Sequence, residues 1–182
     1  YGIGKRMRWL KNNAPKKLVK AKELRNIECL RNIPNNMPGW YKWWAPKQSL
    51  ELLLNSPYIS KNFFSELLPH LTVKNINGID YYYIYVGVAI KESIKERLNW
   101  HVNQHHLKSS VESGFLSTLR QTIASLISGN QYDEEATNKF IDTLIIEYYP
   151  VNMAIKSLKA KDRIEKIEQE ELSTNNLPLN LK

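Results

Sequence analysis

The sequence predicts an α/β fold of the α+β kind, in which a small, mainly antiparallel three-stranded sheet is flanked by helices. Three stretches rich in aromatic and β-branched residues indicate strands, at residues 40–45, 81–88 and 143–151. Stretches with apolar residues at helical spacing lie between and after them. A small sheet formed by such strands buries its faces by packing helices against them.

Charge divides the chain into a basic N-terminal arm and a larger domain. The formal net charge is +8, and residues 1–32 contain ten lysines and arginines against two glutamates, so the remainder is balanced. A loop rich in proline and asparagine marks the boundary. We therefore expect an arm at residues 1–36, with a helix from about Pro15 to Leu30, and a domain at residues 37–182.

The positive charge of the arm suggests a polyanionic partner, because basic segments attract phosphate backbones without reading sequence. A solvated helix with a basic face explains the same composition equally well. The side chains of the arm that are expected to contact nucleic acid are Lys5, Arg6, Arg8, Lys16, Lys17 and Lys20. The arm has only a thin apolar face, and the chain has no apolar run of about 18 residues, so no membrane partner is expected.

The first core strand, at residues 40–45, is expected to place Tyr41 and Trp43 on one face. A segment at about residues 46–80 would follow as an insertion. It contains two short helical patterns and then a strand that returns through an Asn77-Gly78 turn as a hairpin.

The second core strand and the helix after it form the central stretch of the chain, from Tyr81 to His101. Strict alternation predicts two faces for the strand, with Tyr82, Ile84, Val86 and Val88 on one and Tyr81, Tyr83 and Tyr85 on the other. After Gly87, apolar residues recur every four positions and predict an amphipathic helix. Arg97 and His101 are four residues apart, so they share a face of that helix, at the border between core and solvent.

The remainder of the domain is predicted to contain a long helix at residues 111–128, a third strand at residues 143–151 and a last helix at residues 161–172. The aromatic residues of the strands are expected to pack in the core more often than to stack on nucleic-acid bases.

Cysteine and histidine usage limits the redox and metal chemistry. Cys29 is the only cysteine, which excludes an internal disulfide and a cysteine zinc site and suits a reducing cytoplasm. His101, His105 and His106 lie close together in the sequence. No His-Glu-x-x-His pattern accompanies them, so a structural zinc site is not favoured.

The central stretch resembles a known catalytic signature. Tyr85-Val86-Gly87, followed by Arg97 and His101, is similar to the second half of the signature of GIY-YIG nucleases. Gly39-Trp40-Tyr41 is similar to the first half, with Trp in place of the middle Ile. The insertion separates the two halves, as it does in some members that resemble restriction enzymes.

Two further segments extend the resemblance. Ser117-Thr118-Leu119-Arg120 resembles a Ser-x-Leu-Arg segment found after the histidine in a subset of the family. Glu168, with Leu172 four residues later and Pro178-Leu179-Asn180 beyond it, resembles the glutamate of the family's last helix and the motif that closes the domain. Glu165 and Glu171 lie one helical turn on either side, so a different helical register is the alternative. A second candidate set, Asp142 or Glu147 with Pro150 and Asn152, is rejected because it would remove the third strand.

The resemblance implies a metal-dependent endonuclease acting on DNA, with RNA not excluded. Glu168 would hold one divalent ion, Mg²⁺ or Mn²⁺, because these ions prefer oxygen ligands. Arg97 would neutralise the scissile phosphate with its planar guanidinium. Lys95 and Arg120 would add positive charge for nucleic acid.

The remaining roles implied by the resemblance are proton transfer and structural support of the site. Tyr41 would act as the general base or orient the attacking water, which requires a lowered phenol pKa. Tyr85 would hydrogen-bond the phosphate or share that role, and His101 would relay a proton or orient Tyr41. Asn180 would brace the site from behind.

Two other functions fit the same sequence. One is a non-catalytic nucleic-acid-binding module on the same fold, and the other is a protein-interaction domain with no chemistry, whose basic arm binds an acidic protein. A cytoplasmic location is expected, and a homodimer is compatible with the sequence.

Overall fold

The computed structural model describes residues 17–180, apart from the side chains at positions 54, 61 and 64. Four of the cations predicted to bind nucleic acid, Lys5, Arg6, Arg8 and Lys16, lie outside the described residues. The described part has the predicted mixed α/β class.

The described residues form a five-stranded antiparallel sheet with the order β1-β5-β2-β4-β3. The strands are β1 (Lys17–Lys20), β2 (Gly39–Pro46), β3 (Val73–Ile76), β4 (Ile79–Ala89) and β5 (Ile145–Pro150). The three strands predicted as the core are β5, β2 and β4, and they form the centre of the sheet. The sheet has two edge strands beyond the predicted core: β3, which corresponds to the expected hairpin strand of the insertion, and β1, which was not predicted.

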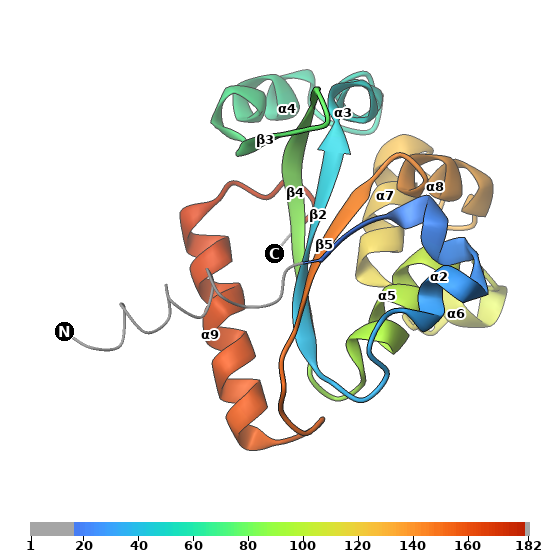
Figure 1. The fold of residues 1–182 in the computed structure, drawn as a ribbon. Helices are drawn as coiled ribbons and strands as arrows, with labels where there is room; N and C mark the ends of the chain where they lie inside the picture. Colours follow the sequence, from blue (N-terminus) through green and yellow to red (C-terminus); the bar gives the residue numbers. More distant parts are fainter. Residues whose placement is uncertain (1–16, 181–182) are drawn as a thin grey trace.

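Helices cover both faces of this sheet (Figure 1). The long helix α9 (Leu158–Thr174) lies along one face, whereas α5 (Ile94–Asn103), α7 (Thr118–Ile127) and α8 (Glu134–Ile141) lie on the other. None of the helices in residues 17–180 has the length and apolar character needed to cross a membrane.

The shorter elements surround these layers. The predicted insertion folds into α3 (Lys47–Leu54), α4 (Lys61–Leu67) and a short 3₁₀ helix, η2 (Leu68–His70), at the same end of the sheet as β3 (Figure 1). The Asn77-Gly78 turn joins β3 to β4 as predicted, and both residues have positive φ, as a tight hairpin requires. The other short elements are η1 (Ala21–Arg25), α2 (Ile27–Arg31) and α6 (Lys108–Glu112).

The central strand β2 separates two apolar cores. Tyr41 and Trp43 pack into the core under α5 and α7, and Trp40 and Trp44 pack into the core under α9. The Trp40 ring stacks on Tyr149 with centroids 3.9 Å apart. These buried tryptophans are packing residues, as expected, and they fix the position of β2 between the two helical layers.

The alternation predicted for β4 is wrong in its second half because the strand contains a β-bulge. Trp43 pairs with Tyr85 and Trp44 pairs with Tyr83, which leaves Ile84 as the extra residue. Ile84 and Tyr85 consequently both join the core under α5 and α7, while Val86 joins the core under α9. The bulge thus turns Tyr85 toward the same face of the sheet as Tyr41.

The helix predicted from Pro15 to Leu30 is also wrong over its first part. Lys17–Lys20 form β1, an edge strand that pairs with β5. Val19 packs against the core from this strand, while the side chains of Lys17 and Lys20 are exposed. Backbone pairing with a sheet edge outweighs the helical spacing here. The 3₁₀ helix η1 follows at Ala21–Arg25, and an α-helix begins only at Ile27, capped by Asn26.

The single helix predicted at residues 111–128 is divided into α6 and α7. Gly114 has a φ of +74°, which ends the helical path, and Ser117 caps the new helix by accepting a hydrogen bond from the amide of Arg120. Phe115 lies in this break and is 72% exposed.

Candidate active site

The two halves of the predicted signature meet on neighbouring strands. Tyr41 on β2 pairs in register with Gly87 on β4, and Gly39 pairs with Ala89. Because of the bulge, Tyr85 projects toward the same side as Tyr41. The side chains from both strands therefore converge beneath α5, the helix that carries Arg97 and His101.

The two glycines of the signature are required by close approaches. A Cβ atom on Gly87 would lie 2.5 Å from the phenol oxygen of Tyr41, and one on Gly39 would lie 2.4 Å from the carbonyl oxygen of Tyr149. Such distances are too short for any side chain. Gly87 therefore creates the space that the Tyr41 ring occupies.

Tyr41 and His101 form a buried hydrogen bond, with 2.6 Å between the phenol oxygen and Nε2 of the imidazole. Both side chains are fully buried. The other imidazole nitrogen, Nδ1, lies 2.5 Å from the hydroxyl oxygen of Ser117, which is also fully buried. Burial, together with the positive charges of Arg97 and Arg120, lowers the pKa of His101 well below its usual value, so the imidazole is neutral.

Arg97 is partly buried between an acid and a phenol. Its guanidinium donates a 3.1 Å hydrogen bond to Glu92 and lies over the ring of Trp100. Its positive charge also acts on Tyr41 and opposes the rise in the phenol pKa. The Nε–H of Arg97 is buried without a hydrogen-bond partner among the described residues. This donor is suited to an anionic oxygen that the protein itself does not supply.

Both site tyrosines are protonated at neutral pH in this state. Burial raises the pKa of Tyr41 well above its ordinary value. Burial also raises the pKa of Tyr85 to about 12, and the carboxylate of Glu168 adds to the rise while Arg97 opposes it. The lowered phenol pKa that a general base needs is therefore absent before substrate binds.

Glu168 lies at mid-length on α9, and its carboxylate acts electrostatically on Tyr85. Burial and the neighbouring Glu165 raise the pKa of Glu168, and Arg97 lowers it. Of the alternatives one turn away, Glu171 is buried and accepts a 2.9 Å hydrogen bond from Tyr83. Glu168 is thus the glutamate of the three whose charge reaches Tyr85 and Arg97.

Asn180 fastens the chain to β4 beside the site. Its side-chain amide donates to the carbonyl of Val86, and its side-chain oxygen accepts from the amide of the same residue, both at 2.8 Å. The amide of Leu179 donates to the carbonyl of Ile84, the bulged residue, at 3.0 Å. These bonds cover the part of the β4 edge that does not pair with β3, and they hold the bulge at Ile84 in place.

The assignment of Arg120 to nucleic-acid binding is wrong. Its side chain is fully buried, and its guanidinium donates to Nε2 of His106 and to the backbone carbonyls of His101 and Val102. A guanidinium enclosed in this way has no access to a phosphate. Lys95, by contrast, is half-buried on the first turn of α5.

The other metal candidates are engaged elsewhere. His105 pairs with Glu134, and Nδ1 of His106 lies 2.6 Å from the carbonyl of Gln131. On the opposite side of the sheet, Glu147 is buried against Lys74. Among residues 17–180, no cluster of three or more His, Cys, Asp or Glu side chains could hold a metal.

If the site takes up a divalent ion, the predicted residue that would hold it is Glu168, whose carboxylate interacts electrostatically with Tyr85 and Arg97. One hard oxygen ligand next to Arg97 and two phenol oxygens fits Mg²⁺ or Mn²⁺, because Mg²⁺ usually retains several waters and uses one or two carboxylates together with phosphate oxygens of the substrate. The same donor set does not fit zinc, which prefers three or four nitrogen and sulfur ligands.

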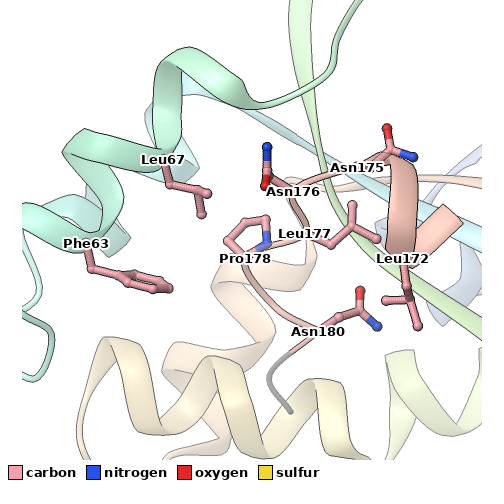
Figure 2. A pocket seen from close by; sticks show the side chains of 8 residues that line it. All are labelled: Phe63, Leu67, Leu172, Asn175, Asn176, Leu177, Pro178 and Asn180. Atoms are coloured by element: carbon pink, nitrogen blue, oxygen red, sulfur yellow. The ribbon is translucent and has the colours of Figure 1, made fainter.

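A pocket of about 270 Å³ borders this region (Figure 2). It lies between α4 and the chain that follows α9, and it is lined by Phe63, Leu67, Leu172, Asn175, Asn176, Leu177, Pro178 and Asn180. Both polar groups of the Asn180 side chain are used on Val86, and the Asn175 amide is used on Glu171. The pocket is therefore a mainly apolar hollow beside the site.

Ser117 is the contact of the site that the sequence did not assign. The Ser-x-Leu-Arg pattern marked it, but the pattern says nothing about a bond to His101. Only the division of the predicted long helix, which places Ser117 at the start of α7, brings the hydroxyl to the imidazole.

The candidate site thus consists of two tyrosines from β2 and β4, an arginine and a histidine from α5, and a glutamate from α9. The family model for the GIY-YIG catalytic domain matches residues 39–182. The chain therefore belongs to the GIY-YIG nuclease family, whose members are endonucleases that act on nucleic acid and generally depend on divalent metals. Comparisons with curated proteins and with solved structures gave no significant match.

Proposed function

We propose that this protein is a metal-dependent endonuclease that hydrolyses phosphodiester bonds in DNA. The observation that supports this most directly is the convergence of Tyr41, Tyr85, Arg97 and Glu168, which come from two strands and two helices and interact electrostatically. Phosphodiester hydrolysis needs a nucleophilic water, neutralisation of charge at phosphorus and a stabilised leaving oxygen. The convergent residues supply groups for each of these needs.

Arg97 binds the scissile phosphate through the buried Nε–H and the guanidinium edge that Glu92 partly occupies. Tyr85 donates a hydrogen bond to the same phosphate. Glu168 would hold Mg²⁺ or Mn²⁺, and such an ion would neutralise phosphate charge and make a water easier to deprotonate. Asn180 keeps β4 in place behind these groups.

Tyr41 is the proton-transfer group for the attacking water. The phenol passes its own proton to Nε2 of His101, 2.6 Å away, as it takes the proton of the water. In the free protein burial opposes this step, because it raises the pKa of Tyr41 and lowers that of His101. Arg97 lowers the pKa of both groups, so it eases the loss of a proton from Tyr41 but makes His101 a weaker acceptor.

DNA beyond the scissile phosphate is bound by positive charge. Lys17 and Lys20 are exposed on β1, and Lys95 lies on the helix that carries Arg97. The basic segment at residues 1–16 adds to this charge. A cytoplasmic location and a homodimer remain predictions.

Plasmid cleavage tests the proposal. We expect supercoiled plasmid to be nicked or linearised with Mg²⁺ or Mn²⁺ and to stay intact with a chelator. Products are read on a gel over a range of plasmid sequences. DNA binding that weakens with salt, without cleavage in any metal, would instead identify a non-catalytic binding module. Preferential binding of an acidic protein would identify the third candidate.

Adding a methyl group at Gly87 is expected to lower the cleavage rate by about 100-fold, because a misplaced proton-transfer group loses most of its contribution. In Gly87→Ala the new Cβ would meet the Tyr41 ring at 2.5–2.6 Å and displace the phenol from His101. The measurement is the single-turnover rate at saturating protein.

The matched test introduces Gly87→Ala into a Tyr41→Phe protein. If the glycine acts by placing the Tyr41 hydroxyl, the combined variant loses little beyond Tyr41→Phe alone. Fully additive losses would show that Gly87 matters for another reason.

A further inference from the structure

The first turn of α7 holds His101 at two points. The hydroxyl oxygen of Ser117 lies 2.5 Å from Nδ1 of the imidazole, and a guanidinium nitrogen of Arg120 donates a 3.0 Å hydrogen bond to the backbone carbonyl of His101. All three side chains are fully buried. The Ser-x-Leu-Arg segment thus fixes both the ring and the backbone of one site residue.

The surroundings of His101 leave its ring uncharged. Arg97 from its own helix and Arg120 from α7 are the nearby cations, and both disfavour an imidazolium. The β-strands contribute Tyr41 and Tyr85, whose phenols are protonated. A neutral imidazole carries one proton, which resides on either Nδ1 or Nε2.

The partners of the ring decide between these two tautomers. The Tyr41 oxygen lies 2.6 Å from Nε2 and the Ser117 oxygen lies 2.5 Å from Nδ1, so each hydroxyl either donates to its ring nitrogen or accepts from it. A phenol is a far stronger acid than the aliphatic hydroxyl of Ser117, so it is the better donor to the imidazole. Nε2 is then bare, and the proton lies on Nδ1, facing Ser117.

We propose that Ser117 is a positioning residue for His101: its hydroxyl oxygen accepts the Nδ1–H and keeps Nε2 free to receive the Tyr41 proton. This inference rests on the proposed function, because the transfer from Tyr41 has a use only in hydrolysis. Ser117 does not touch the substrate and acts through the imidazole. Its second bond, from the amide of Arg120, places the hydroxyl oxygen at the start of α7.

The tautomer can be observed directly in the full chain by nitrogen-detected NMR of the imidazoles, since protonated and bare ring nitrogens resonate far apart. The chain has four histidines, so the His101 signals are assigned by their loss in His101→Asn. We expect Nδ1 protonated and Nε2 bare in the wild type. In Ser117→Ala the Nδ1–H would be buried without an acceptor, so we expect the fraction of rings protonated at Nδ1 to fall. A wild-type ring with Nε2 protonated, or no change in Ser117→Ala, would overturn the proposal.

Cleavage supplies the second readout. Ser117→Ala is expected to cleave about 10- to 100-fold more slowly, which is part of the contribution of a proton-transfer group. Ser157→Ala is the matched control. Ser157 caps α9 by accepting a hydrogen bond from the amide of Ala160, so this variant loses the same kind of helix cap without any change at His101. The cleavage rate of Ser157→Ala should stay within about threefold of wild type, and its loss of thermal stability should be similar to that of Ser117→Ala.

The two readouts separate the two proposals. The expected tautomer shift in a protein that cleaves no DNA would support the placement of His101 by Ser117 and contradict the nuclease function. A normal cleavage rate in Ser117→Ala, beside an active wild type, would overturn the role of Ser117.

Discussion

Replacement of Glu168 by Gln is expected to abolish detectable cleavage while the domain stays folded. Glutamine keeps the size of the side chain but loses the charge that binds a divalent ion. The wild-type carboxylate is half-buried beside Glu165, and its raised pKa shows that the fold disfavours the charged form. Removing the charge should therefore leave the melting temperature unchanged or slightly higher, as is common when a functional charge is lost.

Glu165→Gln is the matched control, because it makes the same change one turn earlier on α9. Glu165 is partly exposed and lies 4.0 Å from Lys161, a weak surface pair. The control should cleave at the wild-type rate. Binding of Mn²⁺ by calorimetry completes the comparison, with loss of binding expected only in Glu168→Gln. Undiminished metal binding and cleavage in that variant would remove Glu168 from the site.

Replacement of Arg97 by Ala is expected to slow cleavage by about 1,000-fold, in line with arginines that neutralise a phosphoryl group in the transition state. The change also removes a cation that lowers the pKa of both Tyr41 and His101, so the phenol releases its proton less readily while the imidazole accepts a proton more readily. The loss of phosphate neutralisation therefore dominates the expected effect. DNA binding should weaken far less than the rate, because the rest of the positive charge remains.

Arg31→Ala is the control for this variant. Arg31 forms an ion pair with Glu28 at 2.8 Å on the surface, so the Arg31→Ala variant loses a comparable ion pair away from the site. Thermal unfolding of both variants checks that the fold persists. Arg97→Lys distinguishes charge from shape: recovery of most of the rate would indicate that charge alone suffices, whereas a rate near that of Arg97→Ala would indicate that the planar fork is required. Wild-type cleavage by Arg97→Ala would contradict the assignment.

Much of the fold could be predicted because strong local patterns coincide with the final structure. The aromatic strand β2, the Asn77-Gly78 hairpin, the four-residue repeat in α5 and the β-rich stretch of β5 were all visible in the sequence. The family was also visible, because short motifs occurred in the right order on the right elements. The match over residues 39–182 confirms that resemblance.

The features that could not be predicted depend on contacts between distant segments. β1 has four residues, and only pairing with β5 makes it a strand. The bulge at Ile84 exists because β4 must fit β2 in two registers, and period-two reasoning has no means to place it. Arg120 appeared to be a surface cation, although its partners on α5 make burial favourable.

The strand order has a consequence for the assembly of the protein. Tyr41, Tyr85, Arg97 and His101 all lie in the stretch from β2 to α5, in which β2 pairs with β4. Glu168 lies on α9, after β5, and the pairing of β5 with β1 joins segments far apart in the sequence, which is entropically costly and slow. A chain in which only the part from β2 to α5 had folded would hold the phosphate-binding groups without Glu168. Nuclease activity would then report that folding is complete, and unfinished molecules would be harmless to the nucleic acid around them.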